Sequence, residues 1–258
     1  MVLAMTTARL TALATAALLS GVAAGCGPSG PSGTPTLDVS AATSLKTALS
    51  SNPPGFPSAQ VRAQFAGSDQ LAAQIRAGAR PDVFASANAK LPAALFKEGR
   101  VQRPVAFTRN ELVLAVPAGS HRVERVEDLA SRGVSLAIGA PAVPVGAYTR
   151  KVLSHLSPAV RSAILRNVRS AEPDVAGIVG KLTQGAVDAG FAYRTDVRAT
   201  NGRLRAITLP ADLAPAVIYD IAVVKGAQHP SQARAYIAML LGPQGQAALR
   251  RAGFLPLP

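Results

Sequence analysis

Two short segments of the sequence place a serine where an apolar run ends and a helical pattern begins. Ser44 follows the run at residues 37–41, and Ser68 follows the run at residues 61–66. The first turn of a helix has unpaired backbone N–H groups and a partial positive charge, so a hydroxyl there favours an anion. Taken singly, each serine is better explained as a helix cap. Taken together, both ends point to the same carboxyl edge of a sheet, where open α/β sheets bind ligands.

A nucleotide-binding loop is not supported by the glycines of the chain. Residues 177–181 read Gly-Ile-Val-Gly-Lys and resemble a P-loop only faintly. The first glycine is misplaced, and Leu182 stands where a hydroxyl would hold magnesium. We therefore reject a phosphate-binding loop at this position.

Metal-dependent and hydrolytic chemistry also lack the residues they need. His121, His155 and His229 are far apart and have no metal-ligand spacing, so we expect them at the surface, with no bare metal cation bound. A secreted hydrolase that used Ser44 or Ser68 as its nucleophile would need a histidine nearby. Catalytic groups can assemble from distant segments, but nothing in the sequence requires one. The sequence predicts no catalytic residues and a protein that is not an enzyme.

The candidate serines belong to a pattern of short apolar runs that alternate with helical stretches. Helical periodicity is clearest at residues 69–77 and 233–241. Strands alternating with helices predict βαβ units, a largely parallel sheet and the α/β class. The predicted strands are residues 37–41, 61–66, 83–85, 112–116, 135–138, 189–192 and 218–224. The length of 258 residues allows one large domain or two lobes.

The composition limits the core and the partners. Hydrophobic residues make up 48% of the chain but aromatic residues only 4%, so the core must consist mainly of Ala, Val, Leu and Ile. A net charge of +13 would suit a nucleic-acid binder, but such a protein gathers Lys and Arg in a stripe interleaved with aromatic residues. Here the basic residues are scattered. We expect a solvated basic surface that favours anions and anionic headgroups, and no nucleic-acid partner.

The first residues are typical of an exported lipoprotein. Arg9 precedes an apolar run at residues 10–24 that is too short to span a bilayer comfortably but suits a signal peptide. The run ends Val-Ala-Ala-Gly before Cys26, which is the single cysteine of the chain, and this ending resembles a lipobox. The alternative is an ordinary signal followed by an incidental cysteine. We expect a signal peptide at residues 1–25 and acylation, such as palmitoylation, at Cys26. This would place the protein in the cell envelope, on the outer face of the cytoplasmic membrane.

A tether follows the predicted anchor. Residues 26–35 are rich in Gly, Ser and Pro, which is typical of a flexible linker. Because one acyl chain alone binds a membrane weakly and reversibly, we expect a second chain or a second signal.

The order of several segments closely resembles the molybdate-binding proteins of ABC transporters, a group of type II periplasmic binding proteins. The likeness covers residues 37–254. It is carried by residues 39–45, 65–79, 81–87 (Pro-Asp-Val-Phe-Ala-Ser-Ala), 139–148, 172–175 (Glu-Pro-Asp-Val) and 191–196 (Phe-Ala-Tyr-Arg-Thr-Asp).

This resemblance implies a fold and a function. The fold has two lobes, each a mainly parallel sheet flanked by helices, joined by two crossover strands. The first lobe comprises residues 36–111 and 218–258, and the second comprises residues 112–217. The protein would bind molybdate, and also tungstate, without a cofactor. As a monomer it would deliver the ion to a permease whose ATPase is a separate subunit. Sulfate or phosphate stays an alternative ligand, because a fold does not identify its ligand.

The resemblance also implies the residues that hold the anion. Ser44 and Ser68 match serine ligands of the family, Val145 and Val175 match residues that donate a backbone N–H, and Tyr193 matches a tyrosine whose phenol completes the shell. We expect Val145 just before a helix and Val175 within one.

Two departures from the family affect this assignment. The loop at residues 139–148 is shorter than in some relatives, so Gly146 is an alternative donor to Val145. Asp69 stands where the family has a small or hydroxylated residue. Its carboxylate would repel a dianion if it faced the cleft, or would cap the helix if it pointed outward.

Overall fold

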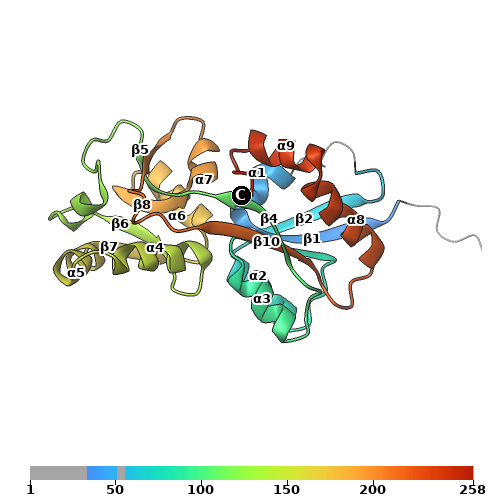
Figure 1. The fold of residues 1–258 in the computed structure, drawn as a ribbon. Coiled ribbons are helices and arrows are strands. Elements are labelled where there is room, and N and C mark those ends of the chain that lie inside the picture. The colour runs from blue at the N-terminus through green and yellow to red at the C-terminus, as the bar shows by residue number, and fades with distance from the viewer. Residues whose placement is uncertain (1–33, 51–55, 258) are drawn as a thin grey trace, which may run out of the picture. The chain divides into compact units, whose positions relative to one another are not determined.

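The computed structural model describes residues 34–50 and 56–257. The predicted signal peptide, Cys26 and most of the tether lie outside the described residues. Residues from Thr34 onward form one compact unit. This unit contains two five-stranded sheets, each flanked by helices (Figure 1).

The first sheet has the order β2-β1-β3-β10-β4 and mixes parallel and antiparallel pairing. The central strand pairs are parallel for β1 with β2 and β3, and antiparallel for β10 with β3 and β4. Its strands are β1 (Thr36–Ala42), β2 (Gln60–Ala66), β3 (Val83–Ser86), β4 (Val105–Asn110) and β10 (Val217–Val223). Its helices are the 3-10 helix η1 (Thr43–Leu45), α1 (Lys46–Leu49), α2 (Ser68–Arg76), α3 (Lys90–Lys97), α8 (Pro230–Leu241) and α9 (Pro243–Arg251).

The second sheet repeats this mixture in the order β7-β6-β8-β5-β9. Strand β6 is parallel to β7 and β8, whereas β5 is antiparallel to β8 and β9. Its strands are β5 (Leu112–Pro117), β6 (Leu136–Gly139), β7 (Val168–Glu172), β8 (Ala189–Tyr193) and β9 (Leu204–Thr208). Its helices are the 3-10 helix η2 (Val126–Ala130), α4 (Pro144–Ser154), α5 (Pro158–Arg166), α6 (Val175–Thr183) and α7 (Arg194–Arg198).

The chain passes twice between the two sheets. Strand β4 continues into β5 with Glu111 alone between them, and residues 209–216 lead from β9 back to β10. The resemblance implies two crossover strands between two lobes, and we use the name lobe for each sheet with its helices. The passages also explain the mixed pairing, because β5 and β10, the first strands after each passage, run opposite to the other strands of their sheets.

The sequence pattern identified the interior strands and missed three others. Each of the seven predicted strands overlaps an observed one, and the strands that were not predicted are β4, β7 and β9. All three lie at the edges of their sheets. Edge strands are partly exposed to water and carry polar residues, such as the Val-Arg-Ser-Ala-Glu of β7, so they lack the apolar run of an interior strand.

The core is mainly aliphatic, as predicted, but its largest side chains are aromatic. Tyr193, Tyr219, Tyr236, Phe84 and Phe107 are all at most 1% exposed. Within the described residues, no helix combines the length and the apolar character needed to cross a membrane.

Candidate functional site

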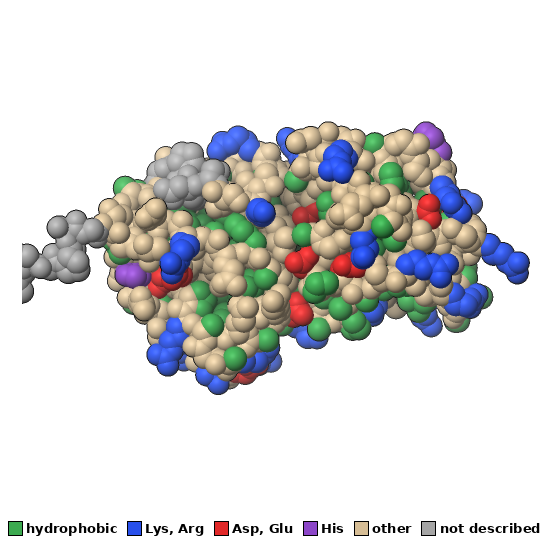
Figure 2. Space-filling model, turned by 180° about the vertical axis from the view of Figure 1, so that it is seen from behind, with side chains coloured by type: hydrophobic (Ala, Val, Ile, Leu, Met, Phe, Trp, Pro, Cys, Tyr) green, Lys and Arg blue, Asp and Glu red, His purple; other side chains and the backbone are tan. Residues whose placement is uncertain are grey.

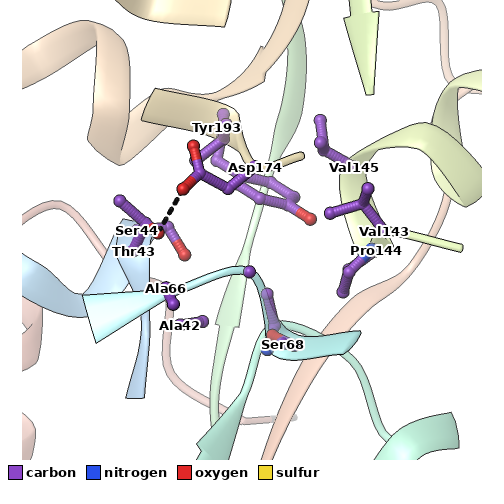
Figure 3. Close-up of a pocket in the computed structure, with 13 residues that line it drawn as sticks. Ala42, Thr43, Ser44, Ala66, Ser68, Val143, Pro144, Val145, Asp174 and Tyr193 are labelled. Carbon is purple, nitrogen blue, oxygen red and sulfur yellow. Dashed lines mark hydrogen bonds between the residues drawn. The ribbon is translucent and has the colours of Figure 1, made fainter. Parts of the chain in front are cut away.

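All five residues predicted to hold the anion line one small cavity (Figure 3). Ser44 and Ser68 reach it from the first lobe, and Val145, Val175 and Tyr193 from the second. The cavity volume is about 20 Å³, on a measure by which one water molecule needs roughly 10–15 Å³. It therefore admits only a ligand of a few atoms.

The two serines are held by other polar groups and cap no helix. Ser44 lies in η1, directly after β1, and its Oγ is 2.8 Å from the phenol oxygen of Tyr219. Ser68 is the first residue of α2, and its Oγ accepts a hydrogen bond of 3.1 Å from the backbone N–H of Ala87. Neither η1 nor α2 has a side-chain cap. The alternative that these serines merely cap helices is therefore wrong in this structure.

The two valines present backbone N–H groups of helix first turns. Helix α4 begins at Pro144, whose fixed φ suits the first position of a helix. Val145 is therefore the second residue of α4, whereas we had expected it just before the helix. Helix α6 begins at Val175, after Asp174 at the N-cap. N–H groups in a first turn have no partner inside their own helix. Both valine side chains are buried, at 1% and 5% exposure, and they contain no polar atom. The backbone amides are therefore the only donors that these two residues offer.

Gly146, the alternative donor, does not line the cavity. It packs against Gly139 and Ala140, where an added Cβ would overlap the backbone. The structure therefore favours Val145 over Gly146 as the residue whose amide faces a ligand.

Tyr193 carries the least satisfied polar group of the cavity. It ends β8, is 1% exposed, and its hydroxyl has no hydrogen-bond partner among the described residues. In Figure 3 this hydroxyl points into the space between Ser68 and the start of α4. Burial raises the pKa of Tyr193 well above its ordinary value, so the phenol stays protonated and can donate. The N–H of Tyr193 donates to Asp196 Oδ2 at 3.1 Å, which fixes the end of the strand.

One carboxylate, which the sequence had not singled out as a site residue, lines the cavity. Asp174 Oδ1 accepts from Gly177 N at 3.0 Å, and its Oδ2 accepts from the Thr43 hydroxyl at 3.3 Å across the two lobes. Among the described residues of the cavity wall, Asp174 is the only one with an acidic or basic side chain of the Asp, Glu, His, Lys or Arg type. The signal that could have identified Asp174 was present, because an acidic residue directly before a helix is a typical N-cap.

Asp69, which had raised the question of repulsion, is not in the cavity wall. It lies in the first turn of α2 but forms no side-chain cap, because Gly67 is the N-cap residue. Its Oδ1 is buried without a hydrogen-bond partner among the described residues. Of the two alternatives for Asp69, capping of the helix is therefore wrong, and a place in the cavity wall is not observed either.

The two lobes approach each other closely beside the cavity. A Cβ added at Gly67, on the first lobe, would lie 2.5 Å from the carbonyl oxygen of Pro173, on the second. Only glycine permits this approach of backbone to backbone. Together with the bond from Thr43 to Asp174, this contact joins the two lobes beside the cavity.

The histidines lie away from this site. His121 contacts Glu124, His155 contacts the carbonyl of Lys151, and none of the three lines the cavity. Among the described residues, no group of three or more His, Cys, Asp or Glu is placed to hold a metal ion.

Comparison with known sequences identifies relatives over nearly the whole described chain. The model of the family described as bacterial extracellular solute-binding protein matches residues 37–255. The molybdate-binding protein ModA of Mycobacterium tuberculosis is 30% identical over 262 residues, which cover 95% of this chain and 96% of the relative. This similarity confirms the resemblance inferred from the sequence segments.

Solved structures show the same fold. The periplasmic molybdate-binding protein of Azotobacter vinelandii has a TM-score of 0.76 at 23% identity, covering 86% of this chain and 99% of that chain. The sulfate-binding protein SubI of Mycobacterium tuberculosis has a TM-score of 0.78 at 18% identity, covering 86% and 87%. At these identities the likeness concerns the fold alone, and it confirms the predicted two-lobed α/β architecture. The oxyanion must be argued from the cavity.

Proposed function

Since this chain belongs to the bacterial extracellular solute-binding protein family, we propose that it binds molybdate outside the cytoplasm and delivers it to the permease of an ABC importer. The observation that carries the proposal is the phenol of Tyr193, buried in the cavity without a hydrogen-bond partner among the described residues. A buried polar group left unpaired costs about 1–3 kcal/mol. A ligand that accepts this hydrogen bond accounts for that cost.

Three hydroxyls would donate to the bound oxyanion. A hydroxyl has one hydrogen and two lone pairs. Because the N–H of Ala87 donates to Ser68 Oγ, the hydrogen of Ser68 remains free for the cavity. Ser44 and Tyr193 would supply the other two hydrogens, from opposite lobes.

Two backbone amides, of Val145 and Val175, would complete the shell. They stand in the first turns of α4 and α6, which have 11 and 9 residues, and Ser68 begins α2. The partial positive charges of three helix N-termini therefore surround the ligand. Hydrogen bonds to an ionised group are stronger than those between neutral groups, and exclusion of water strengthens them further.

The donor set suits a fully deprotonated tetrahedral dianion. Phosphate near neutral pH carries a proton that needs an acceptor, whereas the groups proposed for the shell would all act as donors. Asp174 accepts from Thr43 and Gly177, so only its remaining lone pairs could take that proton. Sulfate has no proton, but its shorter bonds to oxygen would stretch several hydrogen bonds in a shell sized for molybdate. Tungstate is nearly isosteric with molybdate, so we propose that it binds as well.

Several finer features belong to the same proposal. The protein would be acylated at Cys26 and held by its tether at the outer face of the cytoplasmic membrane, and would act as a monomer without a cofactor. The ATPase of the importer would be a separate subunit. Lys and Arg side chains are spread over the face seen in Figure 2, which supports a basic surface that attracts anions and does not suit a nucleic-acid groove.

Three alternatives differ from this proposal in the ligand, the chemistry or the partner. The chain could bind another oxyanion, as the shared fold of the sulfate-binding protein illustrates. A hydrolase would need a base beside Ser44 or Ser68, and no histidine lines the cavity that the described residues form. The helix-turn-helix that a regulator would use to bind DNA was not found in the sequence.

Calorimetric titration of the purified protein with molybdate tests the proposal. We expect one site, tungstate binding nearly as tightly, and no displacement of molybdate by equimolar sulfate or phosphate. Displacement by sulfate would contradict the size argument. Displacement by phosphate would show that Asp174 accepts a proton from the ligand. Absence of any heat with molybdate, tungstate and sulfate would refute oxyanion binding itself.

Serine variants test the residues of the shell. Ser44→Ala and Ser68→Ala should each weaken molybdate binding by about 1.5–3 kcal/mol, or roughly ten- to a hundredfold. Thermal unfolding without ligand should remain cooperative. Unchanged affinity in both variants would remove these serines from the shell.

A further inference from the structure

A buried chain of polar side chains runs behind Ser44 and away from the cavity. Asn110 ends β4 at the passage between the lobes, and its Nδ2 lies 3.2 Å from the phenol oxygen of Tyr219 in β10. That phenol oxygen lies 2.8 Å from Ser44 Oγ. The same Nδ2 donates to Thr195 Oγ1 of the other lobe at 2.8 Å. All four side chains are buried, at 0–5% exposure.

The backbone N–H of Glu111 determines the direction of each hydrogen bond in this series of side chains. The backbone N–H of Glu111 can only donate, and it lies 2.9 Å from Asn110 Oδ1. The carboxamide is therefore oriented with its NH₂ group toward Tyr219 and Thr195, and it must donate to both. Tyr219 Oη thus accepts a hydrogen bond from Asn110 and still holds its own hydrogen, because burial raises the pKa of Tyr219 well above its ordinary value.

The hydrogen of Tyr219 has one acceptor among the described residues, which is Ser44 Oγ. If Ser44 donated to Tyr219 instead, the phenol hydrogen would be buried without an acceptor, which is unfavourable. The favoured order is therefore Asn110 to Tyr219 to Ser44. With its oxygen accepting from Tyr219, Ser44 directs its own hydrogen elsewhere, and it lines the cavity.

We propose that Asn110 and Tyr219 are positioning residues that hold the Ser44 hydroxyl as a donor to the bound oxyanion. This inference rests on the proposed function and deepens it. A protonated ligand that donated to Ser44 would leave the serine's own hydrogen without an acceptor among the described residues, so this hydrogen-bond chain disfavours oxyanions that carry a proton. The bond from Asn110 to Thr195 connects residues of the two lobes, so we expect lobe closure and the order of the hydrogen bonds to be linked through one carboxamide.

Tyr219→Phe is the variant that tests the chain. Phenylalanine keeps the edge-to-face packing of the ring against Tyr193 and Phe254, at 5.9 and 5.4 Å between centroids, so the fold should persist. Without the bond from Tyr219, both lone pairs of Ser44 Oγ would be free to accept, and its hydrogen would no longer be directed toward the cavity. We expect molybdate and sulfate to bind more weakly by similar factors, and phosphate to bind equally well or better. The ratio of molybdate to phosphate affinity should fall about tenfold, the value of one hydrogen bond of modest strength.

Two further variants distinguish a change in the selection between oxyanions from a general loss of oxyanion binding. Tyr236→Phe removes a buried phenol elsewhere in the first lobe and should leave all three affinities unchanged. Thr195→Val removes the partner of Asn110 in the second lobe and should weaken all three oxyanions equally, with the ratio preserved. This second outcome would assign closure to Thr195 and proton order to Tyr219.

Titrations with molybdate, sulfate and phosphate at pH 6, 7 and 8 give the readout. An unchanged molybdate-to-phosphate ratio in Tyr219→Phe would overturn the proposal, because loss of packing weakens every ligand alike. A wild-type protein that binds sulfate but not molybdate would refute the proposed function alone. The ratio of sulfate to phosphate affinity would then still test the hydrogen bonds from Asn110 to Tyr219 to Ser44. If the wild type bound none of the three, both proposals would fail.

Discussion

Replacing Tyr193 by phenylalanine should affect ligand binding and folding stability in opposite directions. The hydroxyl is buried and has no hydrogen-bond partner among the described residues, so in the ligand-free protein it contributes only its desolvation cost. The ring packs edge to face on Tyr219 at 5.9 Å, and phenylalanine keeps that contact. The substitution therefore removes one polar atom and leaves the packing intact.

The two effects can be estimated separately. Burying a hydroxyl without a partner costs about 1–3 kcal/mol, so the variant should gain up to that amount in free energy of unfolding without ligand. Opening of the lobes lets water reach the hydroxyl and reduces the gain. Binding loses one hydrogen bond to an ionised group, about 1.5–3 kcal/mol, or roughly ten- to a hundredfold in affinity.

Denaturant unfolding without ligand and calorimetric titration with molybdate measure the two effects. Tyr236→Phe is the matched control, because its hydroxyl is also buried without a partner among the described residues but lies in α8 against Phe56. It should change stability in the same direction and leave molybdate affinity unchanged. The reasoning is refuted if Tyr193→Phe binds molybdate as tightly as the wild type, or if Tyr236→Phe weakens binding to the same extent.

Three further predictions concern closure, pH and the anchor. Gly67→Ala should weaken molybdate binding at least tenfold, because the added Cβ would hold the lobes apart at Pro173. Gly119→Ala is the control, because a Cβ there has no neighbour within 4 Å and should leave the affinity unchanged. Equal molybdate affinities of the two variants would contradict the closure contact. Burial, and to a lesser extent repulsion by Asp174, raise the pKa of Asp196 from 3.8 to about 7, so the stability contributed by its proton is complete below pH 3.8 and is lost as the pH rises through 7. Asp196→Asn should therefore unfold at a higher temperature than the wild type at pH 8 but not at pH 3.5, and parallel melting curves across this range would refute the assignment. Cys26→Ser should release the protein from membranes into the culture supernatant, as fractionation would show; a wild type that is itself wholly soluble would contradict the anchor.

The parts of the fold that the sequence could predict are those in which burial sets the residue type. Strands β1, β3 and β8 lie in sheet interiors, and their apolar runs follow directly from burial on both faces. Strands β4 and β9 are at edges, where one side of the strand has no neighbour, and their polar residues, Thr-Arg-Asn in β4 and Arg and Thr in β9, interrupt the apolar run. The antiparallel pairing of β10 depends on a connection between lobes, and a local pattern carries no information about it.

The site divides in the same way. Ser44 and Ser68 could be selected from the sequence because a hydroxyl at the start of a helix has a chemical meaning of its own. Val145 and Val175 could not, because a backbone amide has the same chemistry whatever side chain it carries, and the two were found only through the resemblance. The bond between Asn110 and Tyr219 spans 109 residues, and no spacing rule predicts a contact of that kind.

The contrast between the charge of the protein and the charge of its cavity bears on how the ligand is released. The chain carries a net charge of +13, yet the charged residue in the cavity wall, among the described residues, is the carboxylate of Asp174. Surface cations act over a distance and raise the local concentration of anions, which speeds capture. Neutral donors such as the Tyr193 hydroxyl bind strongly only while water is excluded, because water competes for each hydrogen bond once the lobes part. A lysine or arginine in the wall would still attract the anion in the open state and would slow its transfer to a permease. Affinity that depends on closure would allow tight capture and rapid delivery by the same five proposed donors.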